Sequence, residues 1–258
     1  MGGDRSNFYD SHQPSDRRLR HRPLWLKPIT SALRVPKITS MAVNLQSRVI
    51  DLRRKLLAMG AEVEQRVALA VAVVRDGDVD IAKTVRETDA EIDAMQAEVE
   101  NECMRLLALG APVASDLRLI LSAIRISNEL ERIADMAKGS CKRVTKLVES
   151  GSYRFPPALL DMAEATRTML RDVLVALSNE DAKLCLEIRR SDSFVDALNR
   201  EVMLWSREWI TQDVHSTAAA IEILAIGQRF ERMADIITQI AGDTVFLVEG
   251  RILRHGAE

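Results

Sequence analysis

The sequence is poor in aromatic residues, histidine and cysteine, and it has no long apolar run. Aromatic residues make up 4% of the 258 residues, whereas the hydrophobic fraction is 47%. A chain dominated by Ala, Leu, Val, Glu and Arg favours helices over sheets. Its most apolar stretch, 67–74, is closed by Arg66 and Arg75 and is much shorter than the roughly 18 residues of a membrane span. We therefore expect an all-α protein that does not cross a membrane.

The three cysteines, Cys103, Cys141 and Cys185, are far apart and follow neither a metal-site spacing nor a disulfide framework. We expect them to be buried as small hydrophobic residues in a reducing, cytoplasmic compartment. The four histidines do not form the Glu-x-x-His pairs of ferritin-like oxidases. The sequence also lacks a P-loop, a dinucleotide-binding glycine motif and a nucleophile elbow. These absences argue against an enzyme and leave no catalytic residue to name.

Positive charge is concentrated at the N-terminus. Residues 1–40 contain eight Lys or Arg and three Asp, a net charge of +5, so the remainder is near −7. We interpret 1–43 as a basic disordered leader, with Met41 as an alternative first residue. Such an arm can bind anionic lipid or nucleic acid, but a single basic tail is weak evidence for either. We expect no nucleic-acid partner.

Hydrophobic residues spaced three and four apart predict a series of helices from about residue 44 onward. Gly77 suits a helix C-terminal cap, Asp78 suits the next N-cap, and Pro112 suits the first turn of a helix. The segment 151–157 is the strongest interruption and predicts a mid-point linker. The predicted helices are 44–74, 79–109, 112–149, 158–177, 182–210 and 213–250.

The two halves of the chain resemble each other. Asp78 aligns with Asp181 at an offset of 103, and after a three-residue deletion N-E-L-E-R-I-A-D aligns with Q-R-F-E-R-M-A-D at an offset of 100. Long helices joined by short turns must run antiparallel. We therefore predict two tandem three-helix bundle repeats, 44–150 and 151–258.

Each predicted repeat carries two carboxylate pairs with i, i+4 spacing, so both members of a pair lie on one helix face. Like charges at this spacing repel, which indicates a neutralising partner. Oxygen ligands from four such residues suit a hard cation or a carboxylate-bridged multinuclear cluster. The alternative is a solvated face, or ion pairs with arginines such as Arg86, Arg125, Arg132, Arg229 and Arg232. The eight candidate metal ligands are Asp89, Asp93, Glu131, Asp135, Asp192, Asp196, Glu231 and Asp235.

Several spaced motifs resemble the PhoU family. They are a run over 91–118 that begins E-I-D-A-M-Q and ends A-S-D-L-R, the run L-E-R-I-A-D-M-A over 130–137, and the ending L-V-E-G-R-I-L-R-H over 247–255. The similarity covers about 45–255. The chain departs from the family pattern at Ala134 and Ala234, where glycine is usual. It also departs where Asn-Ile-Ala commonly follows, with Gly139-Ser-Cys141 in the first repeat and Gln239-Ile-Ala241 in the second.

The resemblance implies a cytoplasmic six-helix protein of two three-helix repeats that forms a homodimer. It implies a negative regulator of phosphate uptake and phosphate-starvation signalling, with two partners: the ATPase subunit of the phosphate ABC transporter and the sensor histidine kinase. Contact with the membrane would come only through these partners. It also assigns the eight carboxylates to metal clusters, with iron expected and zinc, manganese or magnesium as alternatives. Two other hypotheses stay open: a metal-dependent phosphohydrolase using the same carboxylates, and a metal-free helical scaffold.

Overall fold

The computed structural model describes residues 38–87, 89–109, 112–151 and 154–253, and these residues contain no β-strand. The chain divides into two units, Met1–Ile38 and Thr39–Glu258, and all that follows concerns the second. The predicted leader lies outside the described residues up to residue 37. The all-α prediction is confirmed, and no helix in the described ranges is long and apolar enough to cross a membrane.

The helices agree with the predicted pattern, with three differences. The first helix begins at Ile38 instead of near 44, and the predicted helix 79–109 is described as two segments on either side of Thr88. The third predicted helix begins after Pro112, which therefore precedes the helix instead of lying in its first turn. The elements are α1 (Ile38–Asp76), α2 (Val79–Glu87), α3 (Asp89–Leu109), α4 (Ala114–Ser150), α5 (Pro157–Asn179), α6 (Ala182–Gln212), the 3₁₀ turn η2 (Val214–Ser216) and α7 (Thr217–Glu249).

The turn after the first helix of each repeat is built in the same way. Gly77 takes the left-handed backbone conformation, with φ of 69°, and Asp78 caps α2 by accepting two backbone N–H groups from its first turn. In the second repeat Glu180 takes the left-handed position, with φ of 55°, and Asp181 caps α6. The cap predictions at Gly77 and Asp78 are confirmed, and the second copy uses a less favourable residue at the left-handed position.

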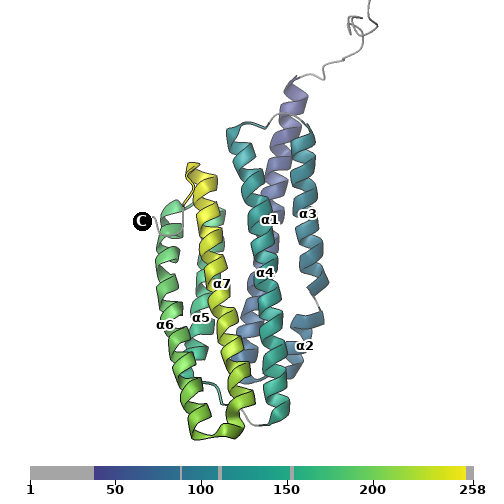
Figure 1. The fold of residues 1–258 in the computed structure, drawn as a ribbon. Helices are drawn as coiled ribbons and strands as arrows, with labels where there is room; N and C mark the ends of the chain where they lie inside the picture. Colours follow the sequence, from purple (N-terminus) through teal and green to yellow (C-terminus); the bar gives the residue numbers. More distant parts are fainter. Residues whose placement is uncertain (1–37, 88, 110–111, 152–153, 254–258) are drawn as a thin grey trace, which may run out of the picture. The chain divides into compact units, whose positions relative to one another are not determined.

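Each repeat forms a bundle. In the second, α5, α6 and α7 all contact one another; in the first, α4 contacts α2 and α3 (Figure 1). The first helix, α1, is tied to α3 by ion pairs along its length, from Arg48 with Glu102 (3.0 Å) to Arg66 with Glu91 (2.9 Å). Because early residues of α1 meet late residues of α3, the two helices run antiparallel. The prediction of two three-helix repeats therefore describes the architecture.

Equivalent helices join the two repeats. Helix α4 packs against α7, and the side chains of Arg118 and Ser122 donate to backbone carbonyls near the end of α7. Arg125 also pairs with Asp243 at 3.1 Å. Helix α1 approaches α5 closely at Gly60, where a Cβ would lie 2.6 Å from the Leu174 side chain. Arg53, earlier on α1, pairs with Glu180 just after the end of α5, so this contact is antiparallel as well. Both contacts join equivalent helices, as expected for two repeats related by a local two-fold axis.

The repeats share one hydrophobic core, because a single cluster of buried residues takes side chains from every α-helix. Burying one large aliphatic or aromatic side chain stabilises a fold by about 1.5–3 kcal/mol. The shared core therefore makes the two repeats one folding unit. Representative buried residues, one per helix, are Leu56, Val85, Ile92, Leu130, Leu159, Ile188 and Phe230.

The left-handed glutamate generates a stability prediction. Replacing Glu180→Gly removes a side chain from a conformation that costs non-glycine residues about 1 kcal/mol or more. It also removes the exposed ion pair with Arg53, which contributes little. We expect a net gain of about 0.5–1 kcal/mol, measured by denaturant unfolding. The matched change Gly77→Ala should destabilise the protein by about 1 kcal/mol; a loss of stability in Glu180→Gly would show that the ion pair dominates.

Candidate functional site

The carboxylate pairs of the second repeat interact with one another. Asp192 and Asp196 lie on α6, Glu231 and Asp235 lie on α7, and these two helices pack together. Partial burial, together with the negative charges of its neighbours Asp196, Asp235 and Glu231, raises the pKa of Asp192 to about 6, and Arg189 opposes this rise. The four predicted residues are therefore close enough to repel, as the repeat alignment implied.

In the first repeat, a lysine lies beside one of the corresponding carboxylates. Asp93 is exposed on α3, Glu131 is half-buried on α4, and the side chain of Asp89 lies outside the described residues. Asp135 is exposed and its carboxylate lies 3.5 Å from the ammonium group of Lys138. Lysine has no counterpart at this position in the second repeat, where Thr238 aligns with Lys138. The two predicted clusters thus differ in charge.

The carboxylates of the second repeat suit a cation in type and charge. They offer only oxygen donors, and burial beside like charges leaves Asp192 poorly stabilised as an anion. However, across the described part of the chain no three Asp, Glu, His or Cys side chains are placed to share one metal ion. A metal in this repeat would therefore have to draw the side chains of α6 and α7 together. The metal assignment stays a prediction.

Two of the five arginines that the alternative reading names, Arg125 and Arg132, pair with other carboxylates. Arg132 pairs with Glu129 at 2.6 Å, and Arg125 pairs with Asp243, and neither partner is a candidate ligand. Arg229 and Arg232 form no hydrogen bond or ion pair with any described residue. For Arg125, Arg132, Arg229 and Arg232, the described residues thus contain no ion pair with a candidate ligand.

Arg229 lies at the contact between the repeats in an electropositive setting. Burial lowers the pKa of Arg229, nearby Arg143 and Arg232 lower it further, and Glu222 opposes them. In the sequence, the only signal for this positive charge is the repeat alignment, in which Arg229 aligns with Glu129. A change of charge sign between equivalent positions marks a place where the repeats have diverged.

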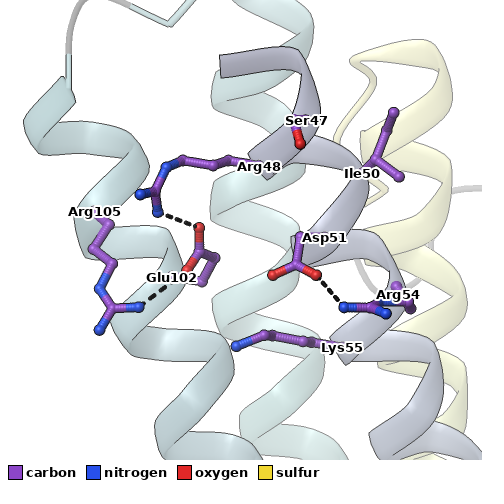
Figure 2. Close-up of a pocket in the computed structure, with 8 residues that line it drawn as sticks. All are labelled: Ser47, Arg48, Ile50, Asp51, Arg54, Lys55, Glu102 and Arg105. Carbon is purple, nitrogen blue, oxygen red and sulfur yellow. Dashed lines mark hydrogen bonds and ion pairs between the residues drawn. The ribbon is translucent and has the colours of Figure 1, made fainter. Parts of the chain in front are cut away.

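A cavity of about 620 Å³ lies between α1 and α3 (Figure 2). Its charged groups are largely paired with one another: the buried carboxylate of Glu102 accepts from Arg48 at 3.0 Å and from Arg105 at 3.4 Å, and Arg54 pairs with Asp51. The pair between Arg48 and Glu102 joins the two helices, and the other two pairs lie within one helix each. The paired charges indicate a structural role for this groove.

The three cysteines are free thiols and all are buried, which confirms their predicted packing role. Burial raises the pKa of Cys103 and Cys141 to about 12 and that of Cys185 to about 11. A thiol is a nucleophile or a metal ligand only as the thiolate. Cysteine chemistry is therefore not the basis of the site.

Comparison with known proteins identifies relatives that match along both repeats. The sequence profile of the PhoU domain matches residues 56–144 and again 159–244. The phosphate-specific transport system accessory protein PhoU homolog of Pseudomonas putida is 35% identical over 209 residues, which are 80% of this chain and 80% of that protein. The corresponding Escherichia coli K12 protein is 29% identical over 208 residues, 80% of this chain and 85% of its own length.

Two solved structures have the same fold. The crystal structure of PhoU from Pseudomonas aeruginosa superposes with a TM-score of 0.77 and 31% identity, covering 80% of this chain and 99% of that one. The phosphate transport system regulatory protein PhoU from Streptococcus pneumoniae gives a TM-score of 0.73 and 27% identity, covering 81% and 99%. With the family profile matched twice and relatives aligned over most of its length, this chain belongs to the PhoU family.

Proposed function

We propose that this protein is a cytoplasmic negative regulator of phosphate uptake and phosphate-starvation signalling. The observation that carries the proposal is the match over both repeats to relatives named phosphate-specific transport system accessory proteins. The proposed partners are the ATPase subunit of the phosphate ABC transporter and the sensor histidine kinase of the phosphate two-component system. The protein reaches the membrane through these partners and forms a homodimer.

The protein acts by binding and not by catalysis. The names of its relatives describe accessory and regulatory proteins, and its thiols are buried and protonated. The rival hypothesis, a metal-dependent phosphohydrolase, uses the same carboxylates and predicts turnover of phosphoesters with added manganese or iron. A screen of simple phosphoesters with the metal-loaded protein separates the two.

Metal binding is a part of this proposal. In the second repeat the ligands would be Asp192 and Asp196 from α6 with Glu231 and Asp235 from α7, and their mutual repulsion supports a cation there. A bound cation supplies positive charge that neutralises these groups and holds α6 against α7. In the first repeat the corresponding ligands are Asp89, Asp93, Glu131 and Asp135. Iron is the first metal to test, followed by zinc, manganese and magnesium.

Removing the central glutamates tests the metal assignment. Elemental analysis of the protein purified without chelator should find less metal in Glu131→Ala and Glu231→Ala than in the unchanged chain, because each change deletes one oxygen ligand. The matched change Glu129→Ala removes a carboxylate on the same helix that pairs with Arg132, and should leave the metal content unchanged. Equal metal content in all four proteins would exclude these ligands.

The raised pKa of Asp192 gives a pH-dependent test on metal-free protein. The folded pKa of about 6 exceeds the ordinary value of 3.8, so folding favours the protonated acid. The stability that protonated Asp192 contributes is complete below about pH 4 and is lost as the pH rises through about 6. With chelator at pH 7.5, Asp192→Asn should therefore raise the stability by about 1 kcal/mol, after allowing for partial exposure, or about 2–4 °C in Tm.

The same variant should respond less to added metal. Near pH 4 the gain in Tm should disappear, and iron or manganese should stabilise the unchanged chain more than Asp192→Asn. The control is Asp161→Asn, which replaces an exposed carboxylate on α5. Its Tm should respond to pH and to metal as that of the unchanged chain does. A gain of stability at pH 4 as large as at pH 7.5 would refute the electrostatic explanation.

A pull-down of the full-length tagged chain tests the regulatory role directly. In cells grown with ample phosphate, we expect the transporter ATPase or the histidine kinase to co-purify with the protein, with less recovered from starved cells. A tagged helical protein of similar size controls for non-specific capture. Recovery of neither partner under both conditions would contradict the proposed function.

A further inference from the structure

A second cavity opens at the contact between the repeats. Its volume is about 340 Å³, within the range of small-molecule sites, and both α4 and α7 contribute to it. It lies beside the two copies of the E-R-x-A-D motif, so equivalent arginines from both repeats reach it. The lining residues are Arg132, Asp135, Met136, Gln228, Arg229 and Arg232.

The cavity carries positive charge without a matching ion pair among the described residues; Glu222 acts on Arg229 but is itself paired with Arg143 and lies 3.5 Å from Lys146. Arg132 is paired with Glu129, and Asp135 is paired with Lys138, so these four charges cancel. Arg229 and Arg232 have no hydrogen-bond or ion-pair partner among the residues that the structure describes. Two guanidinium groups at one cavity are therefore available to a ligand.

Gly139 fixes the position of one of these guanidiniums. A Cβ at this residue of α4 would lie 2.6 Å from Nε of Arg229 and 3.2 Å from its Cζ, so the arginine lies across the helix where a side chain is missing. At the equivalent place in the second repeat the residue is Gln239, and Arg229 itself aligns with Glu129. The two departures from repeat symmetry meet in space, because the glycine makes room for the arginine.

The chemistry of the cavity selects a phosphate-type oxyanion. Guanidinium groups bind the oxygens of phosphate in pairs through parallel N–H donors, which makes arginine suited to this group. Two uncompensated positive charges match the roughly −1.5 to −2 charge of a phosphate group near pH 7 better than the single charge of a carboxylate. Arg143 adds to the field, since it lies near enough to influence Arg229.

We propose that the cavity between α4 and α7 binds a phosphate group through Arg229 and Arg232, with Arg132 at its edge. The ligand is either inorganic phosphate or the phosphate of a small metabolite such as a nucleotide. Because the ligand touches both repeats, its affinity depends on how α4 packs against α7. The choice of phosphate as first probe rests on the proposed function, whereas the site rests on the arginines and the cavity.

Calorimetric titration of the full chain tests this site. Chelator-treated protein at fixed ionic strength is titrated with inorganic phosphate, with ADP and with sulfate. We expect phosphate or ADP to bind with one site per chain, and Arg229→Gln and Arg232→Gln each to weaken binding by about tenfold or more. Binding of ADP alone identifies the phosphate of a nucleotide, and binding of phosphate identifies the free ion.

Three further variants separate a built site from general attraction. Arg125→Gln removes a guanidinium from the same pair of helices outside the cavity and should leave the affinity unchanged. Arg232→Lys keeps the charge but loses the paired donors, so an intermediate affinity is expected. Gly139→Ala keeps every charge but displaces Arg229, and should weaken binding several-fold while circular dichroism shows the fold intact.

The proposal is overturned if neither phosphate nor ADP binds to the chelator-treated protein, or if binding requires added metal, which would assign it to the carboxylates. It is also overturned if sulfate and phosphate bind alike and Arg125→Gln weakens both as much as Arg232→Gln does. None of these results bears on the pull-down, so the proposed function and this site can fail independently.

Discussion

The antiparallel contact between α4 and α7 is the constraint on which the rest of the structure depends. These helices are the last of each repeat and carry the two copies of the E-R-x-A-D motif. Their contact runs from Arg118 near the start of α4, beside the end of α7, to Arg143, which pairs with Glu222 near the start of α7. Because the crossing brings equivalent positions together, Arg132 and Asp135 of the first repeat and Arg229 and Arg232 of the second line one cavity.

The two repeats share a plan but not a charge distribution. In the first, Lys138 lies beside Asp135 and Glu129 holds Arg132. In the second, Asp192 lies among three other carboxylates. A bound cation would therefore relieve more repulsion in the second repeat than in the first. The basic cavity between the repeats has its charge for a similar reason, because Arg229 stands where the first repeat has Glu129. The two repeats therefore share a helical framework, and different residues at a few equivalent positions give them different charges.

The sequence predicted what depends on nearby residues. Helix periodicity, the left-handed Gly77 and the capping Asp78 are local features, and they were read correctly. Pro112 precedes α4 by two residues instead of lying in its first turn, because a proline is compatible both with a first turn and with the segment before it. The internal repeat revealed which carboxylates share a helix face, and the family resemblance covered both halves.

The unpaired arginines could not be read in this way. Their surroundings depend on Gly139, which is 90 residues away in sequence from Arg229 and on another helix. Arg132 pairs with Glu129, three residues earlier on the same helix, and this pair can be read from the sequence. Arg229 stands at the equivalent position before Arg232, so no such pair forms there, but only the packing of α4 on α7 brings these arginines to one cavity.

The burial of all three thiols has a consequence for how the molecule senses its surroundings. With no cysteine at the surface and each thiol held in its protonated form, oxidants and disulfide exchange have no ready point of attack. A shift in cellular redox poise therefore leaves this chain unaltered through its cysteines. Routes that act through an exposed or ionised thiol are therefore closed to this chain.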